Sequence, residues 1–123
     1  MKILAIESSA GPASCAITQD GDILAEAGVN TRLTHSQTLM PMVQDMLRNS
    51  QTALTDIDVL AVAAGPGSFT GVRIGVAAVK GLAFPRETLC APVSTLEALA
   101  AAHTGCGTVL CALDARRAQV YSA

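Results

Sequence analysis

A glycine-rich turn between two apolar segments constrains the fold of this chain more than any other feature. Residues 59–64 form a continuous apolar run, and Gly65-Pro66-Gly67-Ser68-Phe69-Thr70-Gly71 follows it directly. A short apolar run bounded by turn residues is typical of a strand buried on both faces. A helix over about 71–83 is predicted next, so this segment is a sharp strand-to-helix turn that uses the conformational freedom of glycine.

Strand and helix patterns alternate along the rest of the chain. Residues 2–7, 14–18 and 22–29 predict three strands, and Asp20-Gly21 suits a tight hairpin turn between the last two. A helix is predicted over about 35–49 with Thr34 as its cap, followed by a strand over 88–93, a helix from Ser94 or Thr95 to about 102, and a last buried strand over 107–113. This order predicts an α/β fold in which helices cover a mixed sheet that opens on an antiparallel meander of three strands.

The glycine-rich segment leaves two interpretations open. Backbone amides at a helix N-terminus can bind phosphate, and a cofactor would then be contacted by Gly65, Gly67, Ser68 and Thr70. The spacing fits neither common nucleotide motif, because Val72 follows the last glycine where Walker A requires lysine, and the third glycine comes one position too late for GxGxxG. The spacing therefore favours an architectural turn in which the backbone approaches a neighbour closely.

A stripe of small residues follows on the predicted helix. Gly71, Gly75 and Ala78 recur at helical spacing, with Leu82 at the end of the stripe. Glycine inside a helix costs about 0.5–1 kcal/mol relative to alanine, so close packing should offset that cost. Packing within the domain and packing against a partner explain the stripe equally well. On the partner interpretation, the candidate interface residues are Leu39, Val43, Met46, Gly71, Gly75, Ala78 and Leu82.

Charge and composition argue against direct nucleic-acid binding and against catalysis. The net charge is −2, and the longest basic cluster is Arg116-Arg117, whereas phosphate-backbone binding requires a basic face. Ser68 lacks the flanking glycines of a nucleophile elbow, and neither His35 nor His103 has a second histidine at metal-binding spacing. We therefore expect no catalytic and no metal-ligating residue. With no signal peptide or membrane span in the sequence, we expect free cysteines and a cytoplasmic location.

Several motifs resemble one family when taken together and in order. Five segments resemble sequence motifs of the TsaB (YeaZ) family. They are Met1-Lys2-Ile3-Leu4-Ala5-Ile6-Glu7-Ser8-Ser9, Thr34-His35-Ser36-Gln37, residues 65–75, Val93-Ser94-Thr95-Leu96 and Leu113-Asp114-Ala115-Arg116. These blocks cover nearly the whole chain. The resemblance implies an actin-like (ASKHA, ribonuclease H-like) lobe with a five-stranded mixed sheet.

The resemblance also implies a role and partners. Members of this family serve t6A37 modification of tRNAs that read ANN codons, as non-catalytic scaffolds that bind the catalytic subunit TsaD, with the ATPase TsaE joining the complex. In the absence of TsaD they form homodimers through helices of the N-terminal lobe, here those carrying residues 39–47 and 71–82. ATP or ADP would sit at the junction with TsaD. The tRNA would be held only indirectly.

Two departures from the wider superfamily shape these expectations. TsaD carries a His-x-x-x-His metal pair that neither His35 nor His103 completes, which makes a metal-dependent transferase or glycoprotease activity of this chain doubtful. The family also has two lobes, and we expect residues 1–105 to form the N-terminal lobe and 106–123 to begin a truncated second lobe. The alternatives are a nucleotide-binding enzyme of the actin-like class and, least favoured, a peptidase.

Overall fold

Five strands form one mixed sheet in the computed structural model, which describes residues 1–103, 105 and 107–123. The strands are β1 (Lys2–Glu7), β2 (Ala13–Gln19), β3 (Asp22–Val29), β4 (Val59–Ala63) and β5 (Leu89–Val93), in the spatial order β3-β2-β1-β4-β5. The first three pair antiparallel, whereas β4 runs parallel to β1 and β5 runs parallel to β4. The predicted α/β class and its opening meander are confirmed.

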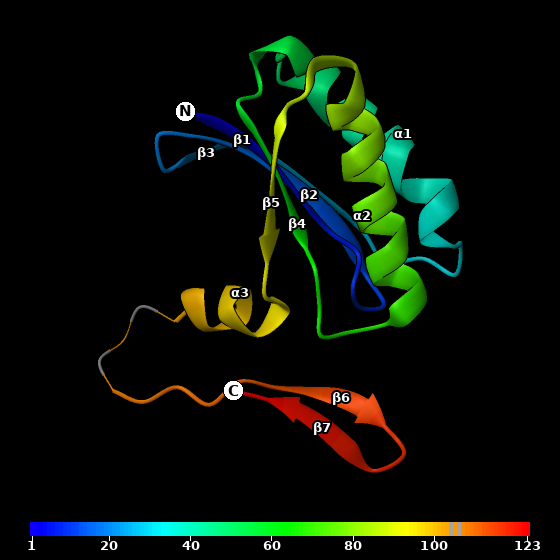
Figure 1. Ribbon diagram of the computed structural model, residues 1–123, viewed down its shortest axis with the longest axis vertical. Helices are drawn as coiled ribbons and strands as arrows, with labels where there is room; N and C mark the ends of the chain where they lie inside the picture. The colour runs from blue at the N-terminus through cyan, green and yellow to red at the C-terminus, as the bar shows by residue number, and fades with distance from the viewer. Residues whose placement is uncertain (104, 106) are drawn as a thin grey trace.

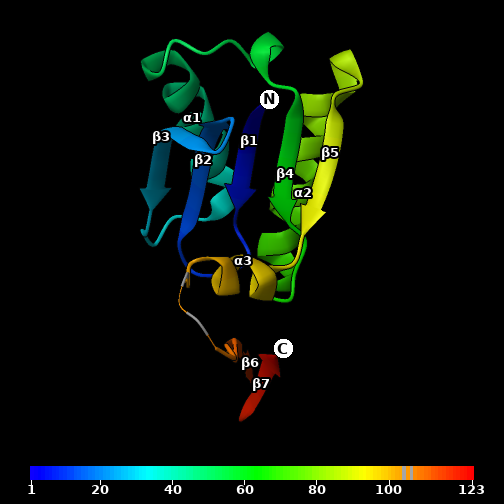
Figure 2. The ribbon, with the colours of Figure 1, turned by 90° about the vertical axis from the view of Figure 1, so that its left-hand side faces the viewer.

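Two long helices lie side by side on one face of this sheet (Figure 1). They are α1 (His35–Asn49) and α2 (Phe69–Ala83), and single 3-10 turns follow as η1 (Leu54–Asp56) and η2 (Phe84–Arg86). The short helix α3 (Thr95–Ala101) lies beyond the ends of the strands, and the described residues place no helix along the opposite face of the sheet (Figure 2). No helix in the described part of the chain is long and apolar enough to cross a membrane.

The hydrophobic core lies between the sheet and these two helices. Alternate strand residues face the helices, so the same strands present a second, less buried set to the other side. The buried sheet residues include Leu4, Ile6, Cys15, Ile17, Leu60 and Val62, and the helices contribute Leu39, Met42, Val43, Met46, Val79 and Ala83. Burial of these side chains supplies the main driving force for folding and fixes where both helices sit.

Local turn and cap predictions agree with the structure. Asp20 and Gly21 have φ angles of 52° and 93°, the left-handed conformation that a tight hairpin turn requires. Helix α1 begins directly after Thr34, whose amide donates a 3.2 Å hydrogen bond to the Gln37 side chain. This contact satisfies a backbone donor at the start of the helix.

The predicted last buried strand over 107–113 is wrong. Regular strand structure begins only at Ala112, where β6 (Ala112–Arg116) pairs with β7 (Gln119–Ser122) in a separate antiparallel hairpin. Val109 and Leu110 are 40% and 77% exposed and join no sheet. An apolar run becomes a buried strand only beside a partner strand, and within the described residues β5 has none on its outer side. The lobe boundary at 105/106 stays a prediction, and Cys106 lies outside the described residues.

Candidate functional site

The glycine-rich loop connects the end of β4 to α2 beside the end of β1. Gly65 has a φ angle of 105°, and the Gly65–Pro66 peptide bond is cis. The carbonyl oxygen of Gly65 accepts a 3.0 Å hydrogen bond from the amide of Thr95, the first residue of α3. Through this hydrogen bond, the loop at the carboxyl end of β4 contacts the start of α3, which follows β5.

Gly67 lies against Ser9, the second residue after β1. A Cβ atom placed on Gly67 would lie 2.5 Å from the carbonyl oxygen of Ser9 and 2.7 Å from its Cβ atom. The same carbonyl oxygen accepts a 2.7 Å hydrogen bond from the amide of Ser68. This contact leaves no space for a side chain, so it explains why glycine is needed at position 67.

Gly71 and Gly75 lie against Ser8. A Cβ atom on Gly71 would collide with the carbonyl oxygen of Ser8, and one on Gly75 would lie 2.5 Å from the Ser8 Oγ and 3.3 Å from Cγ2 of Val62. The Ser8 hydroxyl donates a 2.8 Å hydrogen bond to the carbonyl oxygen of Gly71. Helix α2 therefore lies directly on the end of β1 and on β4, and its glycines serve that contact within the lobe.

This packing corrects the predicted interface. Leu39, Val43 and Met46 are 1%, 0% and 4% exposed because they face the sheet from α1. Gly71 and Gly75 are buried for the same reason on α2. A partner cannot reach these five residues unless the lobe unfolds, so of the seven candidates only Ala78 and Leu82, both half-buried, border the surface.

Three amides at the start of α2 are already engaged within the chain. The Ser68 amide donates to Ser9, the Gly71 amide to the Ser68 Oγ at 3.2 Å, and the Val72 amide to the Ser68 carbonyl oxygen at 2.8 Å. Ser68 therefore acts as the N-cap of α2. A phosphate bound by the loop would have to compete with these contacts.

A cleft of about 870 Å³ lies in front of the loop. Of the four predicted cofactor-binding residues, Gly67, Ser68 and Thr70 line this cleft and Gly65 does not. Arg32 and Arg116 line it as well, and the Nε2 atom of His35 lies 2.7 Å from the carbonyl oxygen of Ala10 at its edge. Within the described ranges, no three His, Cys, Asp or Glu side chains gather in a way that could hold a metal ion.

Sequence reasoning missed the surface that receives α2. Ser8 and Ser9 are 1% and 3% exposed, and Ser9 also lies 3.5 Å from Thr95 through their hydroxyl oxygens. The amide of Ser9 donates a 2.5 Å hydrogen bond to the Glu7 carboxylate, which folds back at the end of β1. The available signal was a pair of small polar residues directly after an apolar strand, which favours close approach by another backbone.

Comparison with known proteins places this architecture in a family. The family model described as TsaD, tRNA N6-adenosine threonylcarbamoyltransferase, matches residues 24–123. The tRNA threonylcarbamoyladenosine biosynthesis protein TsaB of Escherichia coli K12 is 45% identical over 98% of this chain, which covers 53% of that protein. TsaB of Bacillus subtilis 168 is 40% identical over 99% of this chain, which covers 54% of it. The chain belongs to the TsaB (YeaZ) family.

Solved structures agree with this membership. YeaZ from Pseudomonas aeruginosa matches with a TM-score of 0.87 and 35% sequence identity, over 98% of this chain and 58% of that chain. The lobe therefore has the actin-like fold of the TsaB (YeaZ) family. The chain spans about half the length of the curated relatives that it matches.

Proposed function

We propose that this chain serves tRNA threonylcarbamoyladenosine biosynthesis as a non-catalytic scaffold that binds the catalytic subunit TsaD. Its relatives carry the name of this pathway. The observation that supports the scaffold role is a strip of half-buried apolar side chains on α1 and α2. The two helices lie next to each other (Figure 1). A surface of this kind suits helix-on-helix docking.

The outer helix strip consists of half-buried side chains from both helices. Ile74, Ala78 and Leu82 recur at i, i+4 and i+8 on α2, and Met40 and Leu47 are the half-buried apolar residues that we assign to the strip from α1. The proposal retains the predicted contact through α1 and α2. It places that contact on the side of α2 next to the glycines and not on the glycines themselves.

The surroundings of the strip have the composition of a docking surface. The same helices carry exposed polar residues, with Arg73 and Lys80 on α2 and Gln44 on α1. An apolar centre with a polar rim is typical of protein–protein contacts, in which burial of the centre supplies most of the affinity. Arg73 also lies 5.3 Å above the ring centre of Phe69, an exposed aromatic residue one turn earlier on the same helix.

The same strip accommodates the other proposed partners. A second copy of the chain would occupy it in a homodimer when TsaD is absent, and TsaE would join the TsaD complex. Because the chain has a net charge of −2, its partners would bind the tRNA. The complex would act in the cytoplasm. Nucleotide would be held at the junction with TsaD, since amides of the glycine-rich loop are engaged within the lobe.

Co-purification with TsaD followed by a threonylcarbamoyladenosine-forming assay tests this function. We expect the chain to bind TsaD, to raise product formation when TsaD and TsaE are present, and to form no product alone. Failure to bind TsaD, or product formation by the chain alone, would contradict the proposal. Calorimetric titration with ATP and Mg²⁺ separates the enzyme alternative, for which the isolated chain would bind nucleotide tightly.

A further inference from the structure

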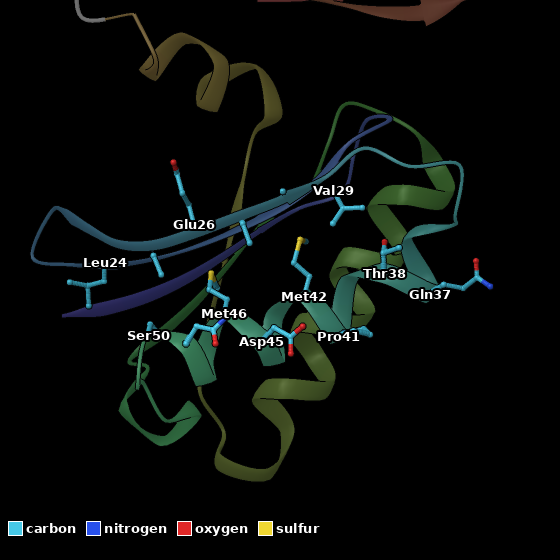
Figure 3. A pocket seen from close by; sticks show the side chains of 14 residues that line it. Leu24, Glu26, Val29, Gln37, Thr38, Pro41, Met42, Asp45, Met46 and Ser50 are labelled. Carbon is cyan, nitrogen blue, oxygen red and sulfur yellow. The ribbon is translucent and has the colours of Figure 1, made fainter.

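An apolar groove runs between the edge strand β3 and helix α1 (Figure 3). It has a volume of about 600 Å³. Ala25, Ala27 and Val29 form the strand side, because they pair with Ile17, Cys15 and Ala13, the β2 residues that are buried on the helix side of the sheet. From α1, the apolar part of the lining consists of Pro41, Met42 and Met46, and the polar part includes Gln37, Asp45 and Asn49.

The strand that borders this groove has a free edge. β3 pairs with β2 on one side and with no other strand of the described chain on its other side. An edge strand presents unpaired amide and carbonyl groups along its length, and an extended peptide can pair with them. Every second side chain of such a peptide would then face the groove, against small strand residues and two flexible methionines.

The charges on the side of β3 that faces away from α1 indicate which kind of peptide segment the groove would bind. Glu26 is exposed and points away from α1 (Figure 3), and Asp22 is exposed at the start of the strand. Among the residues that the structure describes, no lysine or arginine lines the groove. A strand added beside β3 would bring side chains next to Glu26, where lysine or arginine forms a favourable cross-strand pair. A second copy of β3 would instead bring its own carboxylates to this edge, and like charges across strands are destabilising.

We propose that the β3–α1 groove binds an extended segment of a partner protein in which small apolar side chains alternate with lysine or arginine. The segment would add to the edge of the sheet as a further strand. Its apolar side chains would lie over Ala25, Ala27 and Met42, and its basic side chains would face Glu26. This surface is separate from the outer helix strip, so both can be occupied at once.

Fluorescence anisotropy with a labelled peptide of alternating valine and lysine tests this surface on the full chain. We expect saturable binding, and no binding of the same peptide methylated on its backbone amides, since methylation removes the strand hydrogen bonds. Glu26→Lys is expected to weaken binding about tenfold, because it turns an attractive cross-strand pair into a repulsive one. Glu87→Lys, an identical charge change at an exposed turn residue after η2, should leave the affinity within a factor of about two.

Four results would overturn the proposal. They are absence of peptide binding, equal binding of the methylated peptide, an equal loss of affinity in Glu87→Lys, and a dimer of the chain that Glu26→Lys disperses. The methylated peptide tests strand addition, and the charge-matched variant tests whether attraction is specific to this edge. The dimer would mean that a second copy occupies the groove.

Discussion

The hydroxyl group of Ser8 donates a 2.8 Å hydrogen bond to the carbonyl oxygen of Gly71, and so joins the end of β1 to the first turn of α2. Ser8 is buried, and the backbone atoms of Gly71 lie so close to it that a side chain on Gly71 could not be accommodated. This contact fixes α2 on the sheet, and Ile74, Ala78 and Leu82 lie half-buried against the edge of the core.

Replacing Gly75 with alanine is expected to destabilise the fold. The new Cβ atom would lie 2.5 Å from the Ser8 Oγ, and overpacking of this kind costs about 1–3 kcal/mol. Gly81→Ala is the matched control, because Gly81 lies on the same helix with open space around it. It should raise the free energy of unfolding by about 0.5–1 kcal/mol. Urea denaturation measures both, and equal effects of the two variants would show that Gly75 is not packed against Ser8.

The variant Ser8→Ala should partly rescue Gly75→Ala. Ser8→Ala alone loses the hydrogen bond to Gly71, at a cost of about 1 kcal/mol. In the double variant the atom that the new methyl group would meet is gone, so the combined loss should be smaller than the sum of the single losses. A double-mutant cycle by urea denaturation measures this coupling. Strict additivity would mean that the two positions do not touch.

Much of this fold is readable from the sequence because its signals are local. The Asp20-Gly21 hairpin, the Thr34 cap and the Ser94 cap each depend on residues a few positions apart. The alternation of apolar residues in β1 and β2 likewise predicts which side chains face the helices.

The direction of the glycine stripe could not be predicted in this way. Helical spacing shows that Gly71 and Gly75 share one side of α2, but a missing side chain does not indicate which neighbour fills the space. That neighbour is Ser8, more than sixty positions earlier in the chain. The predicted buried strand over 107–113 is wrong for a related reason, since an apolar run gives no sign of whether a partner strand is available.

The cysteines should differ in reactivity and in their effect on stability. Burial raises the pKa of the Cys15 thiol from 9.0 to about 11, whereas Cys90 is exposed. Peptide mapping after brief iodoacetamide treatment near neutral pH should therefore find Cys90 labelled well before Cys15. Rapid labelling of Cys15 in the native chain would contradict its burial.

The raised pKa of Cys15 also predicts a pH dependence. Because the thiol has a higher pKa in the folded chain than in the unfolded chain, its contribution to stability is complete below about pH 9. This contribution is lost as the pH rises toward about 11, since the unfolded chain loses the thiol proton first. The free energy of unfolding should fall by about 2 kcal/mol more in the wild type than in Cys15→Val over this range. Denaturation curves of both chains at several pH values measure the difference, and parallel curves would contradict it.

The most direct test of the proposed docking surface is the mass of the complex with TsaD, measured by light scattering for the wild type and for Ala78→Arg. Ala78 lies at the centre of the outer helix strip, so we expect a joint complex with the wild type and none with Ala78→Arg, which should keep its native circular dichroism. Gln19→Arg, exposed on the hairpin between β2 and β3, should bind TsaD like the wild type. An undiminished complex with a folded Ala78→Arg chain would contradict the assignment of this surface to TsaD.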